Sequence, residues 1–213
     1  MRGEPQALMG AEPVGVPTGN TYDKYGSSNP VVRWMMKGFG TSLCELLERA
    51  DPDSMLDVGC GEGVLTERWA RERPDVRVVG IDLEDVKLQA EWCSRRQANL
   101  EFVAGRAERL PFERNEFDLV SAIEALEHIP QPQQTLSEMA RVARRHLLVS
   151  VPREPLWRAM NLARGGYVGS LGNTPGHVNH WSRRGFCRLL SGYGTVVAVR
   201  SPLPWTMLLV QVG

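Results

Sequence analysis

Short, continuous hydrophobic runs alternate with stretches of helical spacing along most of this chain. The runs are bounded by turn residues and predict five strands, at residues 54–58, 76–82, 100–103, 117–123 and 146–151. Apolar positions three and four residues apart predict the intervening helices, at residues 64–72, 86–96 and 132–144. Such alternation predicts a parallel sheet that is covered by helices on both faces.

The two ends of this pattern extend the predicted fold. Asn29-Pro30 is typical of a helix start, so a helix is expected before the first strand. The runs at 196–199 and 207–212 predict an antiparallel pair that joins the parallel sheet. We therefore expect a single α/β domain over residues 29–213, with a seven-stranded, mostly parallel sheet and an antiparallel strand near the C-terminus.

Two segments lie outside the alternation. Residues 1–28 are rich in small and turn-forming residues and predict a flexible arm, in which Tyr22 and Tyr25 are candidates for a lid over a ligand. Residues 152–181 form a long, irregular stretch, and a loop of that length in a compact domain is usually functional. We expect this second segment to be an insertion that covers a bound substrate.

Composition and charge narrow the class of protein. Hydrophobic residues make up 42% of the chain and charged residues 23%, as in ordinary globular domains. Lys and Arg number 25, as do Asp and Glu, so no excess positive field favours nucleic acid as a partner. No apolar run is long enough to cross a membrane and no leader pattern is visible. We expect a cytoplasmic protein with no membrane partner.

Cysteine spacing excludes two further classes. The four cysteines are far apart and form no C-x-x-C pair: Cys44, Cys60, Cys93 and Cys187. This spacing favours reduced thiols over a disulfide framework or a zinc site.

A glycine turn follows the first predicted strand and precedes a helix. Gly59, Gly61 and Gly63 are spaced so that a ligand could approach the backbone without meeting a side chain. The dinucleotide-binding pattern would require a further glycine at position 64, where this chain has Val64. The turn therefore predicts a nucleotide-like ligand but argues against a nicotinamide enzyme.

Asp82 ends the second predicted strand, 23 residues after Gly59. An acid near this offset accepts hydrogen bonds from both hydroxyls of a ribose. The turn has no basic phosphate clamp, which suits an adenosine ribose without a pyrophosphate. S-adenosylmethionine is a ligand of this kind.

At this point the chain resembles the class I methyltransferases, in particular the type 11 group that includes the ubiquinone- and menaquinone-pathway enzymes, which share a Rossmann-like fold. The resemblance covers roughly residues 56–151. Five motifs carry it in order: Asp57-Val58-Gly59-Cys60-Gly61, Asp82, Ala107-Glu108-Arg109-Leu110-Pro111-Phe112, Phe117-Asp118-Leu119-Val120 and Glu124-Ala125-Leu126-Glu127-His128-Ile129. The resemblance implies an S-adenosylmethionine-dependent methyltransferase.

The same resemblance implies a set of cofactor-binding residues. Asp57, Gly59 and Gly61 would hold the methionine end, Asp82 the ribose, and the backbone of Ala107 the adenine edge. The full expected set is Asp57, Gly59, Cys60, Gly61, Asp82, Leu83, Ala107 and Glu124. Where the family commonly has Asp before that alanine, this chain has Arg106, which carries donors only and either stacks on the adenine or turns to solvent.

Glu124, Glu127 and His128 follow the fourth predicted strand, at the sheet edge where open α/β folds bind ligands. If this segment turns helically, the three side chains share one face and could ligate a divalent cation. Residues 176–183 offer one or two more imidazoles. The pattern resembles two metal-assisted subgroups, the quinone-pathway O-methyltransferases and the small-RNA 2′-O-methyltransferases, and that resemblance implies His180 as the last ligand.

Two other interpretations of these catalytic candidates stay open. His128 could act without a metal, as an acid/base or as a residue that orients the acceptor, and the segment could also be purely structural. Residues 152–181 offer possible walls and anion-binding groups for the acceptor, or simply packing and a solvated face: Trp157, Tyr167, Trp181, Arg153, Arg158 and Arg164.

These observations favour methyl transfer to a small molecule, most simply to a hydroxyl oxygen. An RNA 2′-O-methyltransferase and a non-catalytic S-adenosylmethionine-binding module are the alternatives. For the oligomeric state, a homodimer is a candidate.

Overall fold

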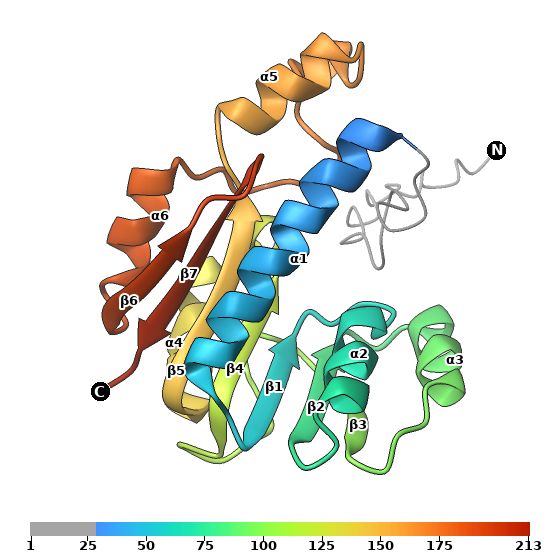
Figure 1. Cartoon of the computed structure of the whole chain (residues 1–213), viewed down its shortest axis with the longest axis vertical. Helices are drawn as coiled ribbons and strands as arrows, with labels where there is room; N and C mark the ends of the chain where they lie inside the picture. Colours follow the sequence, from blue (N-terminus) through green and yellow to red (C-terminus); the bar gives the residue numbers. More distant parts are fainter. Residues whose placement is uncertain (1–28) are drawn as a thin grey trace, which may run out of the picture.

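The computed structural model describes residues 29–213, and a seven-stranded sheet forms their centre (Figure 1). The strand order is β3-β2-β1-β4-β5-β7-β6, and β7 runs antiparallel to both of its neighbours. The strands are β1 (Ser54–Val58), β2 (Arg77–Asp82), β3 (Leu100–Ala104), β4 (Phe117–Ile123), β5 (Ala143–Pro152), β6 (Thr195–Arg200) and β7 (Trp205–Gln211). The predicted sheet, with its antiparallel strand near the C-terminus, is therefore confirmed.

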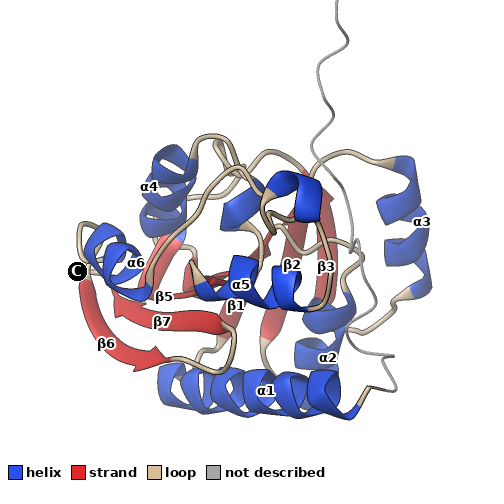
Figure 2. Cartoon of the chain, turned by 90° about the horizontal axis from the view of Figure 1, so that it is seen from above, coloured by secondary structure: helices blue, strands red, loops and turns tan. Residues whose placement is uncertain are grey.

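Helices cover both faces of the sheet (Figure 2). The α-helices are α1 (Pro30–Ala50), α2 (Val64–Glu72), α3 (Val86–Ser94), α4 (Pro132–Val142), α5 (Leu156–Ala163) and α6 (Arg183–Leu190). Two 3₁₀ turns are η1 (Leu126–His128) and η2 (Val168–Ser170). Helices α1 and α2 pack on one face, and α4 and α6 pack on the other.

Alternation along the central strands creates a core on each side of the sheet. In β1, Met55 packs toward α1, whereas Leu56 packs toward α4. In β4, Leu119 and Val120 divide in the same way. All four side chains are fully buried, as expected for parallel strands covered on both faces.

Helix α1 begins where the sequence predicts. The Asn29 side chain accepts a hydrogen bond from the Val31 N–H at 2.9 Å, and Pro30 occupies the first helical position, where no N–H is needed. The first turns of α1 extend past the sheet toward α5 (Figure 1). They form part of the wall of the cavity described below.

The segment 152–181 is more ordered than predicted, because it contains α5 and η2. Asn161 is 4% exposed, and its amide donates to the Gly172 carbonyl at 2.8 Å and to the Thr174 hydroxyl at 3.2 Å. These bonds fasten the helix to the chain that returns from it. Pro155 and the glycines that follow the helix are typical of loops, so the sequence did not predict a helix here.

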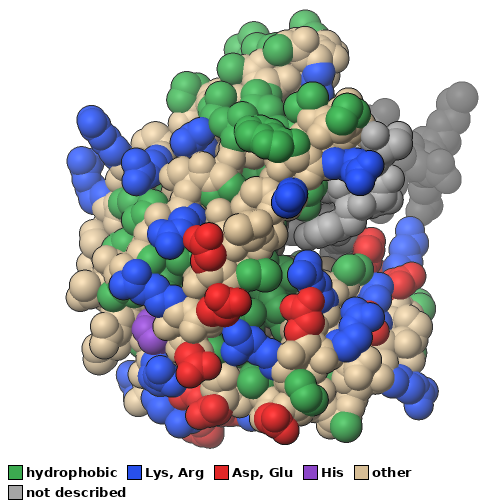
Figure 3. Space-filling model, viewed as in Figure 1, with side chains coloured by type: hydrophobic (Ala, Val, Ile, Leu, Met, Phe, Trp, Pro, Cys, Tyr) green, Lys and Arg blue, Asp and Glu red, His purple; other side chains and the backbone are tan. Residues whose placement is uncertain are grey.

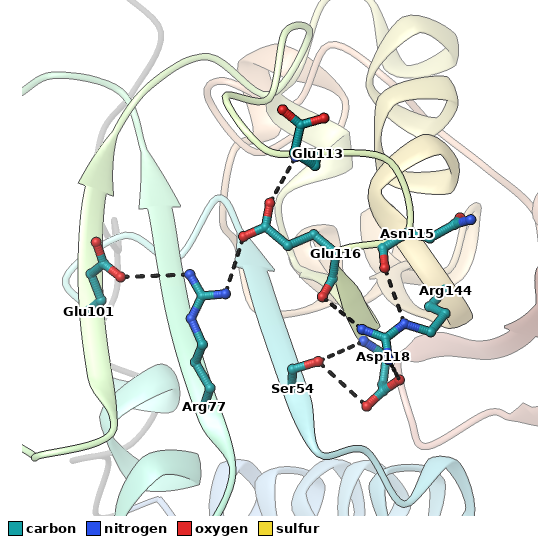
Figure 4. A network of polar contacts seen from close by, with 8 residues as sticks. All are labelled: Ser54, Arg77, Glu101, Glu113, Asn115, Glu116, Asp118 and Arg144. Atoms are coloured by element: carbon teal, nitrogen blue, oxygen red, sulfur yellow. Dashed lines mark hydrogen bonds and ion pairs between the residues drawn. The ribbon is translucent and has the colours of Figure 1, made fainter.

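Ion pairs and hydrogen bonds close the edge of the sheet at which the parallel strands begin (Figure 4). Arg77 lies 3.1 Å from Glu116 and 3.9 Å from Glu101, which links β2, β3 and the start of β4. Asp118 accepts from the Ser54 hydroxyl at 3.5 Å and lies 3.5 Å from Arg144. The opposite edge, where these strands end, carries the glycine turn and the loops that surround a cavity.

Candidate functional site

A cavity of about 650 Å³ lies at the carboxyl ends of the parallel strands, as expected for an open α/β sheet. One side of it is formed by the glycine turn, the end of β2 and residues 105–108. The other side is formed by α1, the loop after β4, α5 and Trp205. The cavity therefore has one side with the Asp57 and Asp82 carboxylates and another side with several methionine and tryptophan side chains.

Two glycines of the turn serve different purposes. Both adopt left-handed backbone conformations, with φ of 74° at Gly59 and 56° at Gly61. A Cβ at position 59 would lie 2.6 Å from the Cβ of Ala125, so this glycine permits close packing against the loop after β4. A Cβ at position 61 would meet nothing within 4 Å. Gly61 therefore leaves open space beside the backbone in the cavity.

Helix α3 holds the turn from outside the cavity. The indole N–H of Trp92 donates to the Gly61 carbonyl at 2.8 Å, and Arg95 Nε donates to the Glu62 carbonyl at 2.6 Å. The motif analysis missed these two side chains. Trp92 lies in α3, and Arg95 is the residue that follows its end. Their spacing of three residues within the predicted helix 86–96 is the signal that could have identified them.

Asp82 joins the end of β2 to the glycine turn. One carboxylate oxygen accepts from the Gly61 N–H and the other from the Leu83 N–H, each at 2.7 Å. Burial raises the pKa of this carboxyl, and the two backbone hydrogen bonds oppose that shift. Each carboxylate oxygen can accept a second hydrogen bond, so the group retains acceptor capacity toward the cavity that it lines.

Asp57 lies deeper and is only 3% exposed. Its carboxylate accepts from the hydroxyls of Thr66 at 2.8 Å and Ser121 at 2.9 Å, so it connects β1 with α2 and β4. Burial raises the pKa of Asp57 to about 6, against the lowering effect of the two hydroxyls. Sequence reasoning did not identify Thr66 or Ser121 as its partners.

The segment after β3 forms the end of the polar side. Ala107 lines the cavity, as expected from the motif. The Arg106 side chain is 72% exposed and lies 3.5 Å from the Glu108 carboxylate. Arg106 also lines the cavity, so both expected positions, over the adenine or toward solvent, remain predictions.

Glu124 does not share a helical face with Glu127 and His128, which corrects the expected arrangement. Its φ of 57° is left-handed, and the helical turn η1 begins only at Leu126. The Glu124 carboxylate accepts from the Ser150 hydroxyl at 3.0 Å and from the Trp205 indole N–H. Strands β5 and β7 thus fix this acid at the cavity wall, and sequence reasoning did not identify either donor.

His177 takes the place that was predicted for other ligands. Ligand atoms of Glu127, His128 and His177 all lie within 4.8 Å of one another, and no group with Glu124 or His180 forms among residues 29–213. The two imidazole rings are edge to face with centroids 4.8 Å apart. Of the two imidazoles in residues 176–183, His177 and not His180 therefore lies beside Glu127 and His128.

Backbone and amide contacts dock residues 176–179 on the loop after β4. The Val178 and Asn179 N–H groups donate to the Glu127 carbonyl at 2.9 and 3.1 Å. The Asn179 side chain donates to the carbonyls of Leu126 and Ile129 at 3.0 and 2.6 Å. This clamp, formed by residues some fifty positions apart, places His177 against His128.

A hydrogen bond sets the tautomer of His128. Its Nδ1 lies 3.0 Å from the Gly176 carbonyl oxygen, which can only accept. The proton therefore resides on Nδ1 and the lone pair on Nε2. An imidazole in this state accepts a proton or a metal through Nε2.

His180 is held elsewhere, and its predicted place beside His128 is wrong. Its Nε2 lies 2.9 Å from an Arg158 guanidinium nitrogen and 2.7 Å from the Asn173 side-chain oxygen. Burial, and then the nearby Arg158 charge, lower the pKa of His180. The side chain is thus engaged in a surface network on the far side of the docked segment.

The apolar side of the cavity contains some of the predicted walls. Trp157, Tyr167 and Arg164 line it, but Trp181, Arg153 and Arg158 do not. Trp181 packs instead on Phe186, with ring centroids 5.5 Å apart. Sequence reasoning missed several further lining residues, among them four from α1, α5 and β7: Met35, Met36, Met160 and Trp205.

Two expectations concern features away from this cavity. The suggested lid residues Tyr22 and Tyr25 lie outside the described residues. No helix within residues 29–213 combines the length and the hydrophobicity that crossing a bilayer requires.

A parallel sheet extended by an antiparallel β7, with a glycine turn after β1 and an acid at the end of β2, defines the class I methyltransferase architecture. Residues 56–148 match a family model described as a methyltransferase domain. The match and the fold together support a class I, S-adenosylmethionine-dependent methyltransferase domain in this chain.

Relatives and solved structures agree with this class. The ubiquinone biosynthesis O-methyltransferase of Psychrobacter cryohalolentis is 40% identical over 84 residues, which are 37% of this chain and 32% of that protein. The one from Photorhabdus laumondii is 34% identical over 96 residues, 42% of this chain and 38% of that protein. The chain thus matches about a third of the length of these curated relatives.

The fold extends beyond the matched segment. Magnesium protoporphyrin IX methyltransferase from Synechocystis, solved with bound SAH, superposes with a TM-score of 0.62 at 18% identity, covering 88% of this chain and 90% of that one. This likeness concerns the fold alone. It covers about twice the share of the chain that the family model matches.

Proposed function

We propose that this protein transfers a methyl group from S-adenosylmethionine to a hydroxyl oxygen of a small-molecule acceptor. The observation that carries the proposal is the single cavity that runs from the glycine turn and Asp82 to the imidazoles of His128 and His177. A cofactor side and an acceptor side are thereby continuous. The O-methyltransferase names of the partial relatives support the choice of oxygen.

On the cofactor side, the chain supplies a cradle and two acids. The open space beside Gly61 accommodates the amino-acid end, and Asp82 accepts from the ribose hydroxyls. Asp57 sits beneath the turn and would attract the ammonium group in its ionised form. Gly59, Cys60, Leu83 and Ala107 line the same side and complete the proposed contacts. The bound cofactor supplies a methyl group that its sulfonium already activates.

On the acceptor side, the chain has to orient the hydroxyl and receive its proton. His128 suits both tasks, because the Gly176 bond leaves its Nε2 lone pair as the acceptor. Glu124, held by Ser150 and Trp205, forms a fixed acidic wall beside it. The aromatic and methionine side chains exclude water from the acceptor.

A divalent cation held by Glu127, His128 and His177 is the second candidate for activating the acceptor. One carboxylate and two imidazoles within 4.8 Å form a suitable donor set for a zinc-like or manganese-like ion. This set replaces the predicted one, because Glu124 and His180 are engaged elsewhere. Such an ion would lower the pKa of a bound hydroxyl.

Calorimetric titration with S-adenosylmethionine, alone and with magnesium, manganese or zinc, tests both proposals. Saturable binding is expected without any metal. If a chelator removes turnover, one of these ions restores it, and that ion fails to restore it in His177→Ala, the cation is established. Turnover that is unchanged by the chelator would leave His128 as the proton acceptor without a metal.

Transfer of labelled methyl groups to a panel of phenols, alcohols, amines and carboxylic acids then tests the acceptor class. Stimulation by an RNA 3′ end would favour the RNA methyltransferase. Tight cofactor binding with no transfer to any acceptor would favour a binding module.

A further inference from the structure

Exposed hydrophobic side chains gather on one lobe of the molecule. Within the described residues, eight large hydrophobic side chains are exposed, and six of them fall in residues 29–44 or 152–181. On the face shown in Figure 3, hydrophobic side chains cover the upper part, where α5 and the start of α1 lie. We call five of them the apolar rim: Val31, Trp34, Leu162, Val168 and Leu171, which are 60, 63, 41, 62 and 75% exposed.

The two stretches that form this lobe, residues 29–44 and 152–181, carry a net positive charge, whereas the whole chain is neutral. Residues 29–44 and 152–181 contain one acid, Glu154, whereas the whole chain has equal numbers of acids and bases. The five cations in these two stretches are Arg33, Lys37, Arg153, Arg158 and Arg164. In Figure 3, Asp and Glu side chains gather on the lower part of the molecule instead.

The rim reaches the cavity at one of its members. Val31 belongs to the rim and also lines the cavity. The basic Arg164, which is not part of the rim, lines the cavity too, and its guanidinium lies over the Tyr167 ring. Met35 and Met36, one turn further along α1, and Met160 of α5 also line the cavity. Helices α1 and α5 therefore contribute apolar side chains both to the exposed rim and to the cavity wall.

We propose that this rim docks on an anionic lipid bilayer, with the acceptor side of the cavity opening onto the membrane. Exposed apolar side chains flanked by Arg and Lys are the combination by which peripheral proteins bind such a surface. Each cation near an anionic leaflet contributes about 1 kcal/mol. The docking surface is independent of the reaction. The further step, that the acceptor is an amphiphile taken from the bilayer, rests on the proposed function.

Co-sedimentation of the full chain with lipid vesicles tests the docking directly, without cofactor or acceptor. We expect binding to mixed phosphatidylcholine–phosphatidylglycerol vesicles, little binding to phosphatidylcholine alone, and weakening by salt. The double variant Arg33→Glu/Lys37→Glu is expected to reduce the partition coefficient at least ~10-fold. Trp34→Ser/Leu171→Ser is expected to reduce it by a similar factor, because apolar burial is lost.

A matched control comes from α3, outside the lobe. Val86 is 82% exposed and Lys87 follows it, so Val86→Ser/Lys87→Glu makes the same chemical changes elsewhere. None of the six substituted residues lines the cavity, so cofactor affinity measured by calorimetry should stay unchanged and reports that each variant is folded.

Absence of binding to anionic vesicles, or an equal loss in the α3 control, overturns the docking proposal. A dimer in sedimentation velocity that the Trp34→Ser/Leu171→Ser variant dissociates, without vesicle binding, would assign the rim to a second copy of this chain. Failure of methyl transfer with vesicle binding retained would instead contradict only the proposed function.

Discussion

The cofactor side and the acceptor side of the cavity are built in opposite ways. The cofactor side comes from residues 57–108, and most of the hydrogen bonds that fix its polar groups stay within this stretch, as in the pairing of Asp82 with Gly61 and Leu83. The bond from Ser121 of β4 to Asp57 is an exception. The acceptor side draws on elements from α1 to β7, joined by contacts such as that of Trp205 with Glu124. The cofactor side is thus built mainly within one stretch of sequence, and the acceptor side from elements that are far apart in the sequence. Substitutions on the two sides should therefore have separable effects.

The largest separation is expected from His128→Ala. Loss of the proposed proton acceptor should lower turnover by about 10²–10⁴-fold. Cofactor affinity should stay nearly constant, because His128 is held by Gly176 and not by the glycine turn. Rapid-quench turnover combined with calorimetry measures both quantities. His146→Ala, which removes a half-buried imidazole outside the cavity, is the control. Unchanged turnover would remove His128 from the reaction.

Asp82→Ala should produce the converse result. Loss of two hydrogen bonds to a charged acceptor predicts a cofactor Kd about 100-fold higher. At saturating cofactor, turnover should be largely retained, because the acceptor side is untouched. Calorimetric titration provides the measurement, with the exposed neighbour variant Glu84→Ala as a control. Equal affinities in the two variants would contradict the ribose assignment.

Two alanine substitutions in the glycine turn should separate an effect on folding stability from an effect on cofactor affinity. Gly59→Ala should destabilise the fold by about 3 kcal/mol, because its Cβ meets Ala125 and the backbone is left-handed. Gly61→Ala should cost only about 1 kcal/mol of stability but raise the cofactor Kd ~10-fold, because its methyl group enters the open space. Urea unfolding and calorimetry distinguish them. A normal Kd in folded Gly61→Ala would show that the space is not occupied by the cofactor.

The smallest expected effect is a pH dependence from Asp57. Because its pKa is raised to about 6, the carboxyl is protonated below that pH and cannot attract the cofactor ammonium. The Kd should therefore fall by about fivefold as pH rises from below to above 6. Calorimetry across this range measures it, and a flat profile is expected for Asp57→Asn.

Folding stability should show the reverse trend with pH. A raised carboxyl pKa contributes stability that is fully present below its ordinary value of 3.8 and is lost as pH rises through about 6. Wild-type protein should therefore lose stability over this interval relative to Asp57→Asn, measured by urea unfolding. Parallel curves for the two proteins would show that the carboxyl is not desolvated.

The local half of the molecule could be predicted closely from the sequence. The boundaries of β1, α2 and β4 agree with the periodicity, because buried parallel strands are continuous apolar runs that glycine and charged turns interrupt. Asp82 was identified by its offset from the turn alone. These features depend on neighbours in sequence, so a motif contains most of the information needed to place them.

The acceptor half could not be predicted in the same way. The choice of His177 over His180 depends on Asn179 reaching the carbonyls of Leu126 and Ile129, a contact that no spacing reveals. The expected helical face at Glu124 failed because a single left-handed residue rotates its side chain toward β5 and β7. Long-range hydrogen bonds, rather than local propensity, decided both positions.

The place of β7 in the sheet has a consequence for the order of assembly during translation. Strand β7 inserts between β5 and β6 although it follows both in the chain, and β6 pairs with no other strand among residues 29–213. A nascent chain that has emerged only as far as β6 therefore has a loose strand and lacks Trp205 beside Glu124. The wall of the cavity at Glu124 therefore depends on the last strand of the chain to be synthesised among residues 29–213.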